Sequence, residues 1–136
     1  MPDQWLPSSS ANASTAWLFP GQGTQEPGMG YALHEGSAAA RDVFQAADSA
    51  LGFPLSRLCF EGSAEALTST DNAQPAIMTV SLACLAAALG TGALTERPGA
   101  MAGHSLGEYT ALVAAGALDL NTALSLVQRR GQLMQV

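Results

Sequence analysis

The sequence predicts an α/β fold built on a parallel β-sheet. Two segments with strand character, residues 15–19 and 100–102, are separated by three or more segments with helical character. Because parallel strands need a long crossover between them, this order favours one sheet covered by helices. The carboxyl ends of both strands then lie at the same edge of the sheet, where α/β proteins bind their ligands.

Size, charge and cysteine content narrow the class of protein. The 136 residues, 48% of them hydrophobic, are enough for one compact core. Five basic and eleven acidic residues give a net charge of −6, which disfavours nucleic acids and anionic membranes as partners. Cys59 and Cys84 are far apart and form no metal-binding motif. We therefore expect no metal site, no disulfide, and a reducing compartment, the cytoplasm.

The start of the chain is expected to precede the fold. Residues 1–14 are polar and rich in serine, and they lack arginine and any long apolar run. They match neither a signal peptide nor a transit peptide, and a flexible extension is expected. The first ordered element is predicted at Thr15–Phe19, a β-rich run that Pro20 ends and that opens into the loop Gly21–Gln25.

Helices are predicted from caps and periodicity. Ser37 is a candidate N-cap for a helix that ends at Leu51, where Gly52 supplies the stop. A short helix is expected after Ser63, ending in a turn at Asp71–Asn72.

Two longer helices follow. Gln74–Pro75 is expected to open the first, because proline in the first turn of a helix gives up no hydrogen bond. The apolar stretch Ala76–Leu89 then forms a buried helix that is too short to span a bilayer comfortably. The last helix is expected to start near Asp119 or Asn121. Its predicted apolar side consists of Leu124, Leu126 and Val127.

The segment Gly-His-Ser-Leu-Gly at residues 103–107 is the most informative motif. It follows a small apolar strand and precedes the helix-compatible stretch Leu106–Leu118, as in a nucleophile elbow. Gly103 and Gly107 leave room for the tight turn, and the backbone of Ser105 is expected to be strained so that its hydroxyl is presented. Ser105 is therefore the candidate nucleophile.

The residues beside Ser105 suggest further roles. Free N–H groups at the start of the following helix can stabilise an oxyanion, and the Leu106 amide is the first such donor. His104 is adjacent to Ser105 in sequence, but neighbouring residues in an extended turn point apart. We expect His104 to support the site rather than to act as the base.

Four short motifs occur in order along the chain. They are Phe19–Gln25, Asp71–Ala76, Gly103–Tyr109 and Arg130–Met134. From about Trp17 to the last residue, the chain resembles the malonyl-CoA:acyl carrier protein transacylases and the acyltransferase domains of fatty acid and polyketide synthases. The resemblance implies a partial α/β-hydrolase-like core over residues 15–136. Family members are roughly twice as long, so their inserted ferredoxin-like subdomain is expected to be absent here.

The resemblance also implies an activity. Ser105 would take the malonyl group from malonyl-CoA as an ester and pass it to the phosphopantetheine thiol of an acyl carrier protein, with no bound cofactor. Gln22 and the Leu106 amide would form the oxyanion hole, Arg130 would hold the free malonyl carboxylate, and Gln74 would line or brace the site.

One part of the family's machinery is missing from the sequence. The family uses a histidine well downstream of the serine as the base, whereas this chain contains only His34 and His104. We therefore expect an amino-terminal part of the domain, with a second chain possible as the source of the rest. Two alternatives stay open: an inert or split-enzyme fragment that binds acyl-CoA or a partner, and an α/β serine hydrolase, which should show an acid and a histidine after the serine.

Overall fold

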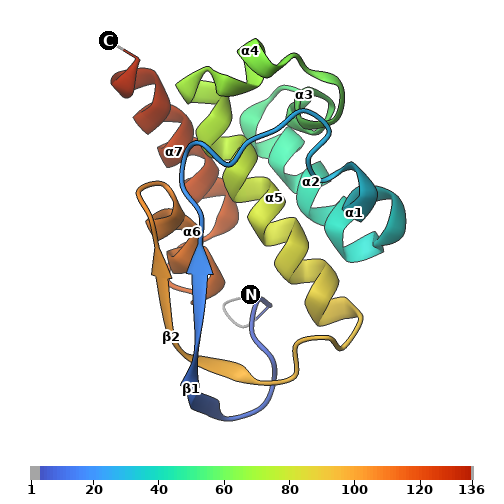
Figure 1. Ribbon diagram of the computed structural model, residues 1–136, viewed down its shortest axis with the longest axis vertical. Helices are drawn as coiled ribbons and strands as arrows, with labels where there is room; N and C mark the ends of the chain where they lie inside the picture. Colours follow the sequence, from blue (N-terminus) through green and yellow to red (C-terminus); the bar gives the residue numbers. More distant parts are fainter. Residues whose placement is uncertain (1–3, 136) are drawn as a thin grey trace.

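The computed structural model describes residues 4–135, which form two strands and seven helices (Figure 1). In chain order the elements are β1 (Ala11–Phe19), α1 (Tyr31–Gly36), α2 (Ala38–Leu51), α3 (Leu55–Glu61), α4 (Ala64–Thr68), α5 (Thr70–Gly90), β2 (Arg97–Gly103), α6 (Gly107–Ala114) and α7 (Leu120–Met134).

The two strands form a parallel sheet, which confirms the predicted α/β class. Trp17 pairs with Met101, and Phe19 pairs with Gly103 at the carboxyl ends. The crossover between the strands contains α1 to α5, as parallel pairing requires. The loops that leave β1 and β2 therefore start side by side (Figure 1).

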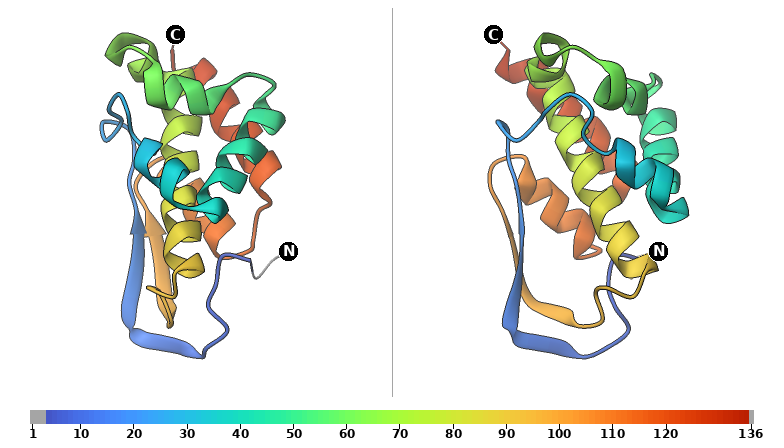
Figure 2. Two further views of the ribbon diagram at one scale, coloured as in Figure 1. Left: turned by 90° about the vertical axis from the view of Figure 1, so that its right-hand side faces the viewer. Right: turned by 45° about the vertical axis from the view of Figure 1, so that its right-hand side comes forward.

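The helices lie on one side of the sheet in both views of Figure 2. The long helix α5 packs between α2 and α7, and α6 packs against both strands. The largest fully buried apolar side chains come from all of these helices and their connections. They are Phe44, Leu55, Leu67, Met78, Leu82, Leu106, Val113, Leu124 and Val127.

The predicted caps are present at α2 and α7. Ser37 Oγ accepts the Ala40 N–H at 3.2 Å, and Gly52 ends α2 with φ 72°. The carboxylate of Asp119 accepts the Thr122 N–H at 2.9 Å, so α7 begins where its sequence signal lies. Each cap satisfies a backbone group that the helix itself leaves free.

The start of α5 differs from the prediction. The helix begins at Thr70, so Asp71–Asn72 forms its first turn and Pro75 lies inside it. The Ser69 carbonyl accepts the N–H groups of Asn72 and Ala73 and thereby closes this earlier turn. Pro75 removes its own N–H from the helix, and its ring crowds the carbonyl one turn earlier, but burial of the surrounding residues outweighs this cost.

The amino-terminal segment also differs from the expected extension. β1 begins at Ala11, and Trp5 is buried in the core. Ser9 Oγ donates to the Thr95 carbonyl, and the Asn12 amide donates to the Glu96 carboxylate. These partners lie more than 80 residues away in sequence, so no local pattern could indicate them.

Two further helices and one helix face were not predicted correctly. α1 and α3 have six and seven residues, which is too short for a periodic signal. Leu126 is 45% exposed, because the buried side of α7 runs along a different row. That row is Ala123, Leu124, Val127 and Gly131.

Among the described residues, only α5 is long and apolar enough to cross a membrane. More than half of its most apolar stretch is buried by the protein itself, as in a core helix. This burial agrees with the prediction of a buried helix over Ala76–Leu89.

Candidate active site

A strand, a tight turn and a helix position Ser105. β2 ends at Gly103 and α6 begins at Gly107. Ser105 has φ 58° and is the only non-glycine residue with a positive φ in the part of the chain that the structure describes. The Ser105 carbonyl accepts the Glu108 N–H at 3.0 Å, which closes the turn. This strained backbone is the expected geometry of a nucleophile elbow.

The glycines of the elbow are required by close backbone contacts. A Cβ on Gly103 would overlap the backbone of Gly107. A Cβ on Gly107 would overlap the carbonyl of Phe19, the last residue of β1. Glycine at both positions therefore allows the turn to fold back onto the ends of the two strands.

The loop after β1 lies against the elbow. The His104 N–H donates to the Phe19 carbonyl at 3.1 Å, and a Cβ on Gly21 would lie 2.5 Å from the His104 carbonyl oxygen. Gln22 is the next residue in this loop. Its exposed side chain donates to Thr70 Oγ1 at 3.4 Å, so it is directed toward the start of α5 rather than bonded to the elbow.

The Leu106 amide is a free donor at the start of α6. Within residues 4–135 its N–H has no hydrogen-bond partner, whereas the next two N–H groups bond to the carbonyls of His104 and Ser105. The Leu106 side chain is fully buried and anchors this backbone. A fixed and unpaired N–H beside a serine hydroxyl has the properties of an oxyanion donor.

Arg130 connects α7 to the elbow and to α5. Its Nη2 donates to Ser105 Oγ at 2.9 Å, and its Nη1 donates to Gln74 Oε1 at 2.8 Å. Its guanidinium carbon lies 5.9 Å from the ring centre of Tyr109, within cation–π distance. The Arg130 guanidinium, carried by α7 and contacted by residues of α5 and α6, is therefore held against the serine.

Gln74 is fully buried on α5. Its amide nitrogen donates to Met134 Sδ at 3.4 Å, and its oxygen accepts from Arg130. A guanidinium has no acceptor, so only the carboxamide oxygen can face it. Gln74 therefore lies between Arg130 and Met134, residues one turn apart on α7.

Gly131 explains why α5 and α7 come so close at this point. A Cβ on this residue would overlap the Thr70 carbonyl and lie 2.7 Å from Asp71 Cα. The first turn of α5 therefore packs directly on the backbone of α7. This contact brings Gln74 within reach of Arg130.

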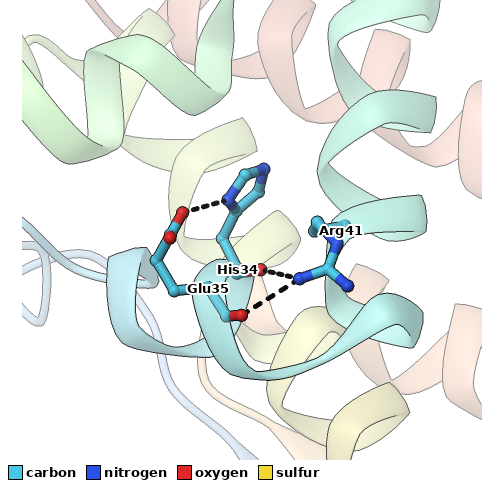
Figure 3. Close-up of polar contacts among 3 residues, drawn as sticks. All are labelled: His34, Glu35 and Arg41. Carbon is cyan, nitrogen blue, oxygen red and sulfur yellow. Dashed lines mark hydrogen bonds and ion pairs between the residues drawn. The ribbon is translucent and has the colours of Figure 1, made fainter.

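Neither histidine is hydrogen-bonded to Ser105. The His34 ring makes an edge-on contact with Phe44 and a tilted contact with Phe60. It also hydrogen-bonds to Glu35, and Arg41 Nη1 donates to the carbonyls of His34 and Glu35 (Figure 3). The side chain of His104 lies beside Gly21. The part of the chain described here therefore supplies no histidine base to the serine.

Three of the predicted site residues, Ser105, Arg130 and Gln74, form one hydrogen-bonded group. The side chains of Gln22 and His104 make no hydrogen bond to these three residues in the part of the chain that the structure describes. Sequence reasoning missed Gly131 and Tyr109 as site-forming residues. Tyr109 lies four residues after Ser105 on α6, a spacing that could have indicated it. No group of three or more possible metal ligands occurs among the described residues.

Comparison with known proteins identifies the family. The family model of the acyl transferase domain matches residues 16–136. The chain belongs to the acyl transferase domain family. A malonyl CoA-acyl carrier protein transacylase from Bacillus subtilis is 52% identical over 119 residues, which cover 88% of this chain and 37% of that relative.

Solved structures agree with the acyl transferase fold. An acyl-carrier-protein S-malonyltransferase from Bartonella henselae has a TM-score of 0.84 and 48% identity, covering 90% of this chain and 40% of that one. A malonyl-transacylase solved in complex with an acyl carrier protein of a type II polyketide synthase has a TM-score of 0.82 and 42% identity, covering 88% and 38%. The chain thus spans about two fifths of the length of these relatives.

Proposed function

We propose that this chain is the serine-bearing part of an acyltransferase that moves a malonyl group from malonyl-CoA to an acyl carrier protein. One observation carries the choice of acyl group: the hydrogen bond between the Arg130 guanidinium and Ser105 Oγ. The free carboxylate of a malonyl group is separated from its thioester carbonyl by one methylene. A cation directly beside the attacking oxygen is therefore well placed to bind it.

In the first half-reaction Ser105 Oγ attacks the thioester carbonyl. A bond forms between Oγ and the carbonyl carbon, the carbon–sulfur bond breaks, and CoA leaves as its thiol after taking up a proton. The Leu106 N–H stabilises the oxyanion of the tetrahedral intermediate. Gln22 becomes the second donor when its amide turns from Thr70 toward the elbow.

In the second half-reaction the thiol of the carrier protein's phosphopantetheine attacks the malonyl ester. The carbon–oxygen bond to Ser105 breaks, and the serine recovers its proton. Gln74 braces Arg130 in both halves, and His104 supports the turn. The chemistry of the chain's own residues uses no cofactor, and a cytoplasmic location is part of the proposal.

The proton of Ser105 needs a base from outside the described residues. We propose that a second chain, or the remainder of a longer one, supplies it together with the rest of the sheet. A groove of about 600 Å³ between β1 and α5 supports this proposal. Its walls are mostly apolar, including Trp17, Leu18, Phe19 and Ile77, and Leu18 is 76% exposed.

Two other functions rank lower. An inert fragment that binds acyl-CoA or a partner is favoured by the lack of a histidine at Ser105. An α/β serine hydrolase has less support, because Arg130 at the nucleophile would serve no purpose toward a neutral ester.

Intact-mass measurement of the chain after incubation with malonyl-CoA tests the proposal. At mildly alkaline pH, where the buffer takes the serine proton in place of the missing base, a slowly formed malonyl adduct is expected on the native chain and not on Ser105→Ala, with acetyl-CoA giving much less. Arg130→Ala should lower the malonyl yield about tenfold or more, since it removes charge-assisted hydrogen bonds to the carboxylate.

Transfer of the adduct to a phosphopantetheinylated carrier protein then separates the candidates. Transfer supports the acyltransferase, whereas release of malonate to water supports a hydrolase. Binding of malonyl-CoA without any adduct, from folded protein, would contradict autonomous catalysis and favour the inert fragment.

A further inference from the structure

The resting position of Arg130 has a consequence for the nucleophile. Both terminal nitrogens of its guanidinium are engaged, Nη1 with Gln74 Oε1 and Nη2 with Ser105 Oγ. The bond to Ser105 uses a lone pair on Oγ, the atom that must attack the thioester. Oγ keeps a second lone pair, but the guanidinium beside it draws electron density from the oxygen and lowers its nucleophilicity, so attack on an acyl group is faster once Arg130 gives up this bond.

Gln74 determines where Arg130 stays when that bond breaks. The Gln74 side chain is fully buried, and Met134 Sδ accepts from its other end, so its oxygen stays directed at Arg130. The close contact of Gly131 with the first turn of α5 fixes the position of α7 relative to α5. Arg130 can thus turn on its Nη1 contact without leaving the site.

A carboxylate competes for Arg130 better than a hydroxyl does. Two charge-assisted hydrogen bonds to a carboxylate are stronger than one bond to a neutral oxygen. An acyl group that carries a carboxylate therefore draws Nη2 away from Ser105, while an acyl group without one leaves it in place.

We propose that Gln74 is a positioning residue that holds Arg130 against Ser105 in the empty site, so that only a carboxylate-bearing acyl thioester frees the nucleophile. This inference rests on the proposed function and extends it. Arg130 then acts twice in selection, since it binds the correct acyl group and restrains the serine against the wrong one. Both the binding of the acyl carboxylate and the restraint of Ser105 then depend on the buried amide of Gln74, which positions Arg130.

Two substitutions of Gln74 test the inference in the 136-residue chain. Gln74→Met keeps the length of the side chain but removes the acceptor for Nη1. We expect the ratio of malonyl to acetyl adduct at Ser105 to fall about tenfold, with acetylation faster and malonylation slower than in the native chain. Gln74→Glu keeps the shape and adds a charge that competes with the substrate for Arg130. It should raise the malonyl-CoA concentration needed for half-maximal labelling about tenfold or more.

A second readout does not depend on acyl transfer. Phenylmethanesulfonyl fluoride is neutral and has no carboxylate. Ser105 Oγ forms a bond to its sulfur, the sulfur–fluorine bond breaks, fluoride leaves, and the hydroxyl proton passes to the buffer. We expect sulfonylation of Ser105 to be several-fold faster in Gln74→Met than in the native chain at mildly alkaline pH, with Ser105→Ala as the blank.

The matched controls are Gln45→Met and Gln45→Glu, the same changes at an exposed glutamine of α2. They should leave both readouts unchanged.

Equal malonyl and acetyl losses in folded Gln74→Met, with unchanged sulfonylation, would mean that Gln74 is only structural and would overturn the inference. If Gln74→Met does not fold, the same comparison with the isosteric Gln74→Glu decides it, and an unchanged concentration dependence contradicts it. If no acyl adduct forms at all, the proposed function fails, and the sulfonylation rates still decide whether Arg130 restrains Ser105.

Discussion

At the scale of single residues, the two cysteines differ in burial. Cys59 is fully buried, and burial, with a smaller contribution from the Asp48 carboxylate, raises the pKa of its thiol to about 12. Cys84 is exposed at the surface of the groove, and partial burial raises the pKa of its thiol as well. Cys59 therefore belongs to the core, whereas Cys84 is accessible from solvent.

The raised pKa of Cys59 makes stability depend on pH in the alkaline range. From about pH 9 upward the thiol ionises in the unfolded chain but stays protonated in the folded one, so the unfolded state binds fewer protons. Ionisation of Cys59 therefore leaves the free energy of unfolding unchanged below about pH 9. Above this pH, the free energy of unfolding decreases by up to about 1.4 kcal/mol per pH unit.

Urea unfolding at a series of pH values from about 8 to about 11 measures this slope. Cys59→Ala lowers stability throughout because it leaves a cavity, but its pH slope should be flatter than that of the native chain. Cys84→Ala is the control and should change the slope less. A native slope that persists in Cys59→Ala would assign the effect to other groups.

At the scale of elements, the site is formed where α5 and α7 pack directly on each other. Gly131 permits this contact, and it sets the distance between Gln74 and Arg130. The elbow depends in a similar way on Gly103 and Gly107. The glycines therefore position the polar side chains that they do not themselves touch.

Gly131→Ala should separate the two helices. The added methyl group would overlap the backbone of Thr70, so we expect a loss of about 1–3 kcal/mol in the free energy of unfolding. The malonyl-to-acetyl labelling ratio should fall along with it. Denaturant unfolding and intact-mass labelling of the same variant check both effects.

Gly36→Ala is the matched control, because an added Cβ meets no atom within 4 Å there. Its stability should stay within about 0.5 kcal/mol of the native value. A Gly131→Ala variant as stable as this control would show that α5 and α7 tolerate a wider spacing.

At the scale of the whole molecule, the main surface feature is an open apolar groove between β1 and α5. It has mostly apolar walls and a volume of about 600 Å³, and Cys84 is among its lining residues. Exposed apolar surface of this kind favours association. The relatives are more than twice as long as this chain, and the proposal of a second part fits this surface.

Cys84 offers a direct measurement of whether the groove is covered. We expect iodoacetamide to modify Cys84 but not the buried Cys59 in the chain alone. Addition of a polypeptide that carries the carboxyl-terminal part of the Bacillus subtilis relative should slow this modification, because it covers the groove.

Mass spectrometry of the modified peptides, with Cys84→Ser as the blank, follows the reaction. A complex that forms while Cys84 stays as reactive as before would place the partner on another surface.

Local sequence patterns were enough to predict the fold class, the elbow and the caps of α2 and α7, because the strands, turns and helix ends concerned depend on neighbours within a few residues. Ser37, Gly52 and Asp119 act on their own helix ends, and the glycines around Ser105 are needed by the turn itself. The family resemblance carried by the four motifs also indicated Ser105, Gln74 and Arg130 as site residues, and these three meet in the structure.

How these residues contact one another depends on the folded arrangement of distant parts of the chain. The tertiary structure joined Gln74 and Arg130 across 56 positions, paired the segment before Thr15 with β2, and started α5 before Pro75. Each of these features depends on burial against distant parts of the chain, which outweighs local preference. The Arg130–Ser105 hydrogen bond belongs to the same class, since a charged side chain near the end of a helix is ordinarily solvated and becomes part of a site only when packing directs it inward.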